Sequence, residues 1–462
     1  MPTTLDCEVL CDLYGSQSVR EVFDSRGLVQ GWLDAERALA GAEADLGVIP
    51  QSAADRIARE ADASLYDLAE LRSGIADSQH PLVPLIRALS GRCGEDGHYV
   101  HWGATTQDII DTGLVLQIRA ALVFVRADLD RSLESAADLA RRFAATPMAG
   151  RTHGQHAVPI TFGLKAATWT EQLRGCSQRL EEAQRTALTA QLGGAAGTLA
   201  ALDPDGAEVR AGFARRLDLV EPELPWHTDR ARFRDLGHAL SEIAAAGERI
   251  AAEIISLQAT EVGELAEPTN DRSVGSSTMP QKQNPMTCEY IVASARLARA
   301  ATGVLVHSAL HVHERDMAAW ATEWIALPQA LILTGGLLEK LAHVLDGLVV
   351  ETEAMARNLG LTHGRIMAEA AMMALAQSIG HERAHQLVTA AARRAVAEQR
   401  DFAEVLRADP TVADTLSPGQ LAQILDASLY LGLAREAALS AAARAESVVP
   451  ASVETMSGRH PS

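Results

Sequence analysis

The sequence predicts an all-α chain in three parts, with a long central helix bundle. Aromatic residues make up only 4% of the 462 residues, whereas alanine is frequent, and this composition favours closely packed helices over a β-sandwich. Apolar side chains recur at i, i+3, i+4 and i+7 in most windows, for example over residues 27–47. We expect no strand-rich segment and no internal repeat.

The longest helical patterns lie in the middle of the chain. We expect long helices over residues 108–143, 159–190, 229–265, 286–312 and 319–347. At 1.5 Å per residue the longest would span roughly 50 Å, and helices of this length pack side by side in bundles. Their alanine-rich, partly apolar faces favour an oligomer.

Polar segments with glycine or proline interrupt the helical pattern at residues 98–108, 150–159, 193–206 and 275–285. After about residue 355 the pattern changes to shorter helices. We therefore expect an N-terminal helical domain (1–107), a central long-helix bundle (108–355) and a C-terminal helical cap (356–462).

The bulk properties exclude several classes of protein. The net charge of -19 argues against nucleic acid or an anionic membrane surface as a partner. The five cysteines are scattered without a CxxC pair, which favours a reducing cytoplasm over a disulfide framework. No signal peptide is expected at the N-terminus, and no run of 18 uncharged apolar residues predicts a membrane span.

The polar segments share hydroxyl, amide and cationic side chains. The segment GATTQD offers two threonines and a glutamine, GRTHGQ offers threonine, histidine and glutamine, and GSSTMPQKQNP offers serines, a lysine and an asparagine. Such donors, with one lysine, suit the binding of a small dicarboxylate without a metal ion. No cofactor is expected.

The stretch GSSTMPQKQNPMTCE resembles the signature of the fumarase/aspartase superfamily, GSSxMPxKxNPxxxE. The resemblance covers nearly the whole chain and points to the adenylosuccinate lyase and 3-carboxy-cis,cis-muconate cycloisomerase branch. It implies an all-α homotetramer whose active sites are each shared between three subunits. It also implies anti β-elimination from a succinyl compound.

The resemblance also implies the site residues. Ser276 is the catalytic base, Glu289 the acid that partners His153, and His80 a further catalytic residue. The fixed donors would stabilise the doubly charged intermediate formed when a proton beside a carboxylate is removed. The implied substrate-binding residues are Thr105, Thr106, Gln107, Thr152, Gln155, Ser277, Lys282, Asn284 and Arg315.

Flanking residues guide the choice within this branch. The stretches HWGATTQDIIDT, PWHT and EWIALP are similar to the cycloisomerase, but His153, Glu289 and His80 favour elimination over ring closure. We therefore expect a fumarate-releasing carbon–nitrogen lyase whose leaving group is an amine, an amino acid or nitrite from a nitrosuccinate-type substrate. Cycloisomerase and adenylosuccinate lyase-like activities are the alternatives.

An adenylosuccinate lyase is disfavoured because its phosphate-binding residues are replaced. Ser16 stands where that family carries an arginine, and the serines and arginine after HERD become Ala318, Trp320, Ala321 and Trp324. Asp229 is a further departure, and its role, like those of Trp320 and Trp324, stays open.

Two other classes of function compete with the lyase. The segment HERAH (381–385) fits the helical zinc pattern H-E-x-x-H, although no third ligand is evident, so no metal is expected. A non-catalytic homologue is the other class. His80 and Arg315 also have structural alternatives, as a packed histidine and a solvated helix charge.

Overall fold

The computed structural model describes residues 7–269, 279 and 281–447. The chain divides into two compact units, each made of three stretches. Unit 1 comprises Met1–Leu129, Cys176–Arg249 and Tyr290–Lys340, and unit 2 comprises Asp130–Gly175, Ile250–Glu289 and Leu341–Ser462. The three-part division expected from the sequence stays a prediction.

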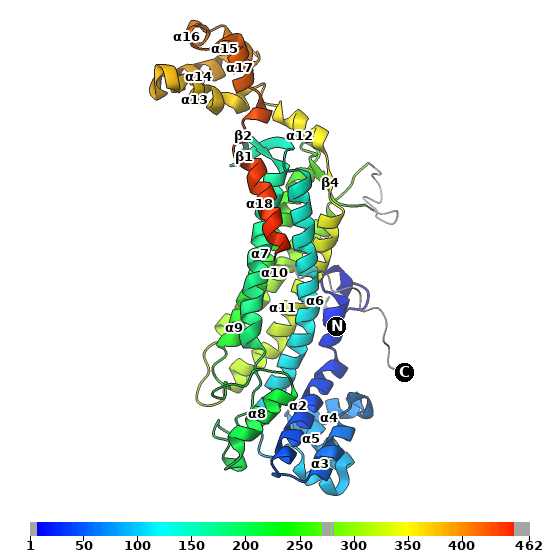
Figure 1. Ribbon diagram of the computed structural model, residues 1–462. Coiled ribbons are helices and arrows are strands. Elements are labelled where there is room, and N and C mark those ends of the chain that lie inside the picture. Colours follow the sequence, from blue (N-terminus) through cyan, green and yellow to red (C-terminus); the bar gives the residue numbers. More distant parts are fainter. Residues whose placement is uncertain (1–6, 270–278, 280, 448–462) are drawn as a thin grey trace. The chain divides into compact units, whose positions relative to one another are not determined.

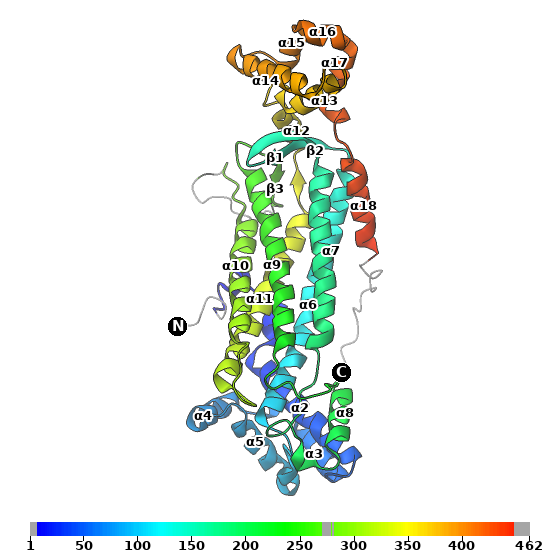
Figure 2. The same ribbon diagram turned by 90° about the vertical axis from the view of Figure 1, so that its left-hand side faces the viewer.

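Five long helices dominate the structure and confirm the all-α class with its long-helix bundle (Figure 1). They lie side by side in two perpendicular views (Figure 2). Each overlaps one of the expected stretches, and they are α6 (Thr106–Arg142), α7 (Phe162–Ala187), α9 (Ala231–Gln258), α10 (Met286–His307) and α11 (Met317–Asp346).

The helical periodicity of the sequence decides which side chains are buried. In α9, Leu236, Leu240 and Ile243 recur every three or four residues and are all fully buried. The helix ends at Gln258, earlier than expected, and is followed by a turn in which the amides of Val262 and Gly263 donate to the carbonyl of Ala259.

Unit 1 also holds the shorter N-terminal helices. The N-cap residue Asp24 accepts a hydrogen bond from the amide of Gly27 (2.6 Å) and so starts α2. The shorter helices of this unit are α1 (Gln17–Val22), α2 (Ser25–Asp45), α3 (Gln51–Glu60), α4 (Leu68–Ser78), α5 (Val83–Cys93), α8 (Gly206–Arg216) and the 3₁₀ helices η1 (Cys11–Leu13), η2 (Ala63–Leu65), η3 (Gly94–Tyr99) and η4 (Ala200–Leu202).

Glycines allow α2 and α6 to cross closely. A Cβ atom on Gly31 would lie 3.0 Å from the carbonyl oxygen of Gly113, so the two backbones touch where side chains would separate them. This contact fixes the first turns of α6 against α2.

Unit 2 contains an antiparallel hairpin that the sequence analysis did not expect. Strands β1 (Pro147–Thr152) and β2 (Gln155–Thr161) pair through a turn in which His153 and Gly154 have φ values of 54° and 73°. Positive φ at both central positions is typical of a two-residue hairpin turn. A second pair joins β3 (Leu265–Ala266) to β4 (Val349–Val350).

The remaining helices of unit 2 are short, as expected for the end of the chain. Several pack around a separate apolar cluster that includes Leu375, Phe402 and Leu406. The elements are α12 (Thr352–Leu359), η5 (Arg365–Met367), α13 (Ala368–Ile379), α14 (His381–Ala397), α15 (Phe402–Arg407), α16 (Pro410–Thr415), α17 (Pro418–Ile424), η6 (Ala427–Leu429) and α18 (Ala434–Glu446).

Helix α11 is long and apolar enough, by length and composition, to cross a membrane. However, 67% of its most apolar 18-residue window is buried inside the protein, as expected for a core helix. The segment HERAH lies at the start of α14, and the described residues contain no group of three or more histidine, cysteine or acidic side chains able to hold a metal ion.

Candidate active site

Asp108 organises the loop that carries the first group of expected site residues. Its buried carboxylate accepts hydrogen bonds from the backbone amides of Thr105 (3.0 Å), Gly193 (2.9 Å) and Gly194 (2.9 Å). It also lies 2.7 Å from Nε2 of His227. One carboxylate therefore joins the start of α6 to two segments that follow much later in the chain.

The side chains of Gln107 and Arg315 are hydrogen-bonded to each other. Gln107 is fully buried, donates from Nε2 to the carbonyl of His227 (2.9 Å) and accepts at Oε1 from Nε of Arg315 (2.9 Å). Arg315 also donates from Nη2 to the carbonyl of Ala195 (3.1 Å). Gln107 is thus occupied by protein partners in this conformation, and substrate binding by either residue stays a prediction.

His80 lies against Thr106 at the start of α6. Its Nδ1 accepts a hydrogen bond from the amide of Val83 (3.2 Å), so the neutral ring carries its proton on Nε2. Nε2 is 3.4 Å from Oγ1 of Thr106. The structure therefore brings these two expected site residues together within unit 1. The backbone amide of Val83 fixes the orientation of the His80 ring.

The hairpin of unit 2 carries Thr152, His153 and Gln155 on its exposed tip. Arg151 anchors it through two hydrogen bonds to the buried carboxylate of Glu264, at 2.9 Å and 2.7 Å. Bidentate pairing of this kind fixes an arginine in orientation as well as position. Sequence reasoning missed this pair because the partners lie 113 residues apart.

Within the segment of the superfamily signature, Met279 and the residues from Gln281 onward are described. Ser276 and Ser277 lie outside the described residues. Lys282 is exposed and Asn284 is half-buried, and both belong to unit 2.

Glu267 holds the start of α10. Its carboxylate accepts hydrogen bonds from the backbone amides of Cys288 (2.5 Å) and Thr287 (3.2 Å), which are otherwise unpaired at a helix N-terminus. Burial and this neighbouring carboxylate raise the pKa of the Cys288 thiol far above its ordinary range, which favours the neutral thiol over the thiolate.

Glu289 and His153 are both exposed, and neither is hydrogen-bonded to the other. The expectation that Glu289 orients His153 therefore has no counterpart within one copy of the chain and stays a prediction.

A buried ion-pair cluster in unit 1 was not foreseen. Arg230 donates to both carboxylate oxygens of Asp111 (2.7 and 2.9 Å) and to Glu323 (3.1 Å), while the indole of Trp320 donates to Asp111 (2.8 Å). Burial opposes the charge of Arg230, but the two carboxylates outweigh it and raise its pKa. The hydrogen bond to Asp111 gives Trp320 a structural role in this cluster. Asp229 has a different role, because its carboxylate accepts a hydrogen bond from the amide of Ala231 (3.2 Å) at the start of α9.

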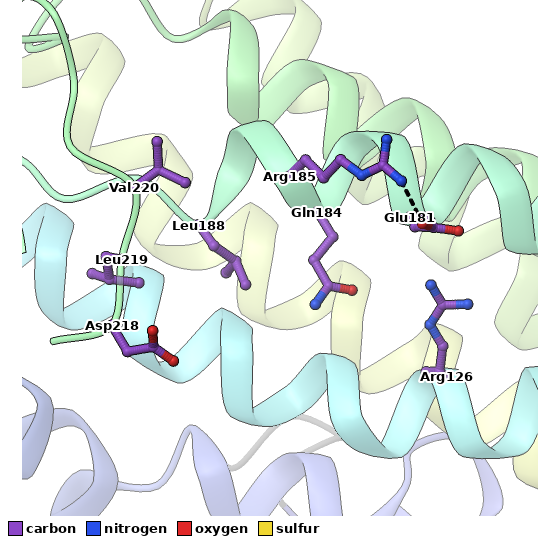
Figure 3. A pocket seen from close by; sticks show the side chains of 8 residues that line it. All are labelled: Arg126, Glu181, Gln184, Arg185, Leu188, Asp218, Leu219 and Val220. Carbon is purple, nitrogen blue, oxygen red and sulfur yellow. Dashed lines mark hydrogen bonds and ion pairs between the residues drawn. The ribbon is translucent and has the colours of Figure 1, made fainter. Parts of the chain in front are cut away.

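A cavity of about 520 Å³ lies elsewhere in unit 1 (Figure 3). Arg185 pairs with Glu181 at 2.5 Å, one turn apart on α7. None of the expected site residues is among the described residues that line the cavity. Its lining residues are Arg126, Glu181, Gln184, Arg185, Leu188, Asp218, Leu219 and Val220.

The chain belongs to a lyase family of the fumarase/aspartase superfamily. Residues 15–299 match the family described as Lyase, and residues 364–438 match the one described as Adenylosuccinate lyase C-terminus. The resemblance seen in the sequence is thereby confirmed.

Several proteins that are similar to this chain in sequence are 3-carboxy-cis,cis-muconate cycloisomerases. The 3-carboxy-cis,cis-muconate cycloisomerase of Pseudomonas aeruginosa is 42% identical over 90% of this chain and 92% of its own length. The crystal structure of the 3-carboxy-cis,cis-muconate lactonizing enzyme from Pseudomonas putida superposes with a TM-score of 0.90 at 38% identity, covering 95% of this chain and 99% of that one. The N-acetyl-S-(2-succino)cysteine lyase of Enterococcus italicus is 38% identical over 93% of this chain and 94% of its own length.

The prediction of a fumarate-releasing carbon–nitrogen lyase is wrong, because these cycloisomerases match the chain over almost its full length. The physical reason lies in the intermediate. Elimination and ring closure both pass through a carbanion stabilised by a neighbouring carboxylate, so both need the same fixed donors. His153 and Glu289 therefore do not reveal which bond is made or broken.

Proposed function

We propose that this chain is a cycloisomerase that closes a carboxylated cis,cis-muconate to a lactone. The observation that carries the proposal is the 42% identity to a 3-carboxy-cis,cis-muconate cycloisomerase over nearly the whole of both chains. The Thr106 hydroxyl beside His80 supports it, because it is a donor of the kind that a polycarboxylate needs.

The proposed reaction is an internal addition. One carboxylate oxygen of the muconate adds to the distal carbon of a conjugated double bond, forming the C–O bond of the lactone. The π electrons move onto the carboxylate at the other end of that double bond. The carbon beside this carboxylate then takes a proton, so the product is an isomer of the substrate.

The residues would divide this work in two. Thr105, Thr106, Lys282 and Asn284 would donate to the carboxylate that receives the charge, since donors fixed in advance stabilise charge without reorganising. Ser276, which would remove a proton in the elimination direction, would supply it during ring closure.

Several of the other expected residues would bind the other carboxylates. His153, paired with Glu289 of a neighbouring copy, would present a donor, together with Thr152, Gln155 and Ser277. No metal or cofactor has a role in this scheme.

A deuterium experiment tests the reaction. We expect 3-carboxy-cis,cis-muconate in D₂O to lose its diene absorbance and to give one product that carries a single carbon-bound deuterium, observed by mass spectrometry and NMR. Ser276→Ala should lower kcat by about 100-fold or more with the fold retained, because a general acid contributes about that factor. Absence of lactone, together with release of fumarate from a succinylated thiol, would contradict the proposal.

The proposal includes a homotetramer with each active site shared between three subunits, in a cytoplasmic protein. Exposed apolar side chains on α10 and α11, such as Val304 (38% exposed) and Ile325 (70%), support burial between copies. The cysteines at positions 7, 11, 93, 176 and 288 are all free, which supports a reducing compartment.

Mixing inactive variants tests the shared site. Thr106→Val and Lys282→Met should each abolish most activity, and co-expression should restore about a quarter of it, because random assembly gives that share of sites both intact residues. The control mixes Lys282→Met with Asn284→Ala, whose residues lie on one segment and so give no recovery. Equal recovery, or none, in both mixtures would refute sharing between subunits.

A further inference from the structure

Gln258, the last residue of α9, contacts the segment of the superfamily signature. Its side-chain amide donates a hydrogen bond from Nε2 to the backbone carbonyl of Gln283 (3.3 Å). Gln283 lies between Lys282 and Asn284, the two expected substrate-binding residues that the structure describes in this segment. Gln258 therefore holds the stretch of backbone from which both side chains extend.

The oxygen of the same side-chain amide has a second partner. Oε1 of Gln258 accepts a hydrogen bond from the backbone amide of Glu267 (2.9 Å). The carboxylate of Glu267 in turn accepts from the amides of Thr287 and Cys288 at the start of α10. A glutamine suits this position because its side chain both donates and accepts. It fixes the signature segment directly at one carbonyl and, through Glu267, at the start of the helix that follows.

The backbone that carries this glutamine is itself held in place. The carbonyl of Leu257 accepts a hydrogen bond from the amide of Glu264 (2.9 Å), which closes the connection after α9. The buried carboxylate of Glu264 accepts from Arg151 (2.9 and 2.7 Å) and from Nδ2 of Asn358 (2.8 Å). Asn358 also donates to the carbonyl of Val262 (2.8 Å) within the same connection. A side chain that starts from a fixed backbone can define the position of what it binds.

We propose that Gln258 is a positioning residue of the active site, which sets the place of Lys282 and Asn284 through the carbonyl of Gln283. The inference rests on the roles that the proposed reaction gives to these two residues. Lys282 is exposed, and a lysine side chain has many rotamers, so a fixed backbone limits where its ammonium group reaches. A displacement of about 1 Å can lower a rate by about 100-fold.

Gln258→Met tests the role, because methionine has a similar length but neither donates nor accepts strongly. We expect kcat for lactone formation from 3-carboxy-cis,cis-muconate to fall by about tenfold or more, with KM changed by less than about threefold. This split indicates an interaction that matters mainly in the transition state. The matched control is Gln386→Met, at an exposed glutamine of α14 that bonds only to Glu382, and it should leave both constants unchanged.

Gln258→Glu separates the two contacts of the side chain. A carboxylate can still accept from the amide of Glu267, but it cannot donate to the carbonyl of Gln283. We therefore expect Gln258→Glu to have a kcat no higher than that of Gln258→Met, while circular dichroism shows that both variants are folded. A natural kcat in either variant would overturn the proposal, and recovery in Gln258→Glu alone would show that the residue serves only Glu267.

Hydrogen exchange of the full-length protein without substrate provides a measurement that needs no turnover. The amide of Lys282 donates to the carbonyl of Met279 (3.0 Å), and the amide of Met286 donates to that of Asn284 (2.9 Å). Exchange of these two amides reports local opening of the segment. They should exchange at least about threefold faster in Gln258→Met and Gln258→Glu than in the natural protein and in Gln386→Met.

The two measurements separate this proposal from the proposed reaction. Unchanged exchange in both Gln258 variants would overturn the positioning role, whatever reaction the protein catalyses. Faster exchange in both variants, together with no lactone from the natural protein, would support the positioning of the segment and contradict only the proposed function.

Discussion

Replacement of Arg230 by methionine is expected to lower the free energy of unfolding by about 3–5 kcal/mol. Methionine fills similar space but leaves Asp111 and Glu323, which are 0% and 3% exposed, without their cation. Buried carboxylates without a partner are costly because nothing replaces their hydration. Urea unfolding followed by circular dichroism at neutral pH measures the loss.

An exposed ion pair provides the control. Arg185→Met breaks the pair with Glu181, whose side chains are 71% and 52% exposed, and should cost less than about 1 kcal/mol. Adding Glu323→Leu to Arg230→Met should recover part of the stability, since one stranded carboxylate is removed. Similar small losses in both single variants would show that the buried cluster contributes nothing special.

Glu43→Gln is expected to stabilise the protein, and increasingly so as the pH rises. Burial, with a smaller effect of neighbouring Glu36, raises the pKa of Glu43 from an ordinary 4.5 to about 9. Both carboxylate oxygens are buried without a hydrogen-bond partner among the described residues. The protonated form is therefore the one that the folded protein accommodates.

The direction of the pH dependence follows from proton binding. Between pH 4.5 and 9 the folded chain holds a proton at Glu43 that the unfolded chain has lost, so stability falls as the pH rises. Glutamine has no such proton. The stability difference between Glu43→Gln and the natural protein should widen by about 4 kcal/mol from pH 6 to pH 9, at 1.36 kcal/mol per unit.

Unfolding curves at several pH values measure this difference. Glu436→Gln, at an exposed position on α18, is the control and should leave the pH dependence unchanged. Parallel pH profiles for Glu43→Gln and the natural protein would show that Glu43 is not held protonated.

The long helices were predictable from the sequence because their burial repeats locally. The buried residues Leu236, Leu240 and Ile243 have the three- and four-residue spacing that is visible in the sequence alone. The hairpin of β1 and β2 was missed, although alternation in HAVPIT and the glycine at 154 were available signals.

Contacts between distant residues account for what the sequence could not show. Arg230 pairs with Asp111, which is 119 residues away in the sequence, and Arg151 pairs with Glu264, which is 113 residues away. No local sequence pattern predicts pairs that are this far apart. Thr106 does lie against His80, while the roles of these two and of the other expected site residues stay predictions. The reaction was not predictable, because donors for one carboxylate serve both ring closure and elimination.

The hydrogen bonds of Asp108 limit how this protein can be re-engineered. The carboxylate ties Thr105, the glycines at 193 and 194, and His227 into one unit. Grafting the loop around Thr105 alone from a relative would leave some of these donors without an acceptor. A chimaera that transfers all three segments together keeps the hydrogen bonds of Asp108, so these segments should be exchanged as a block.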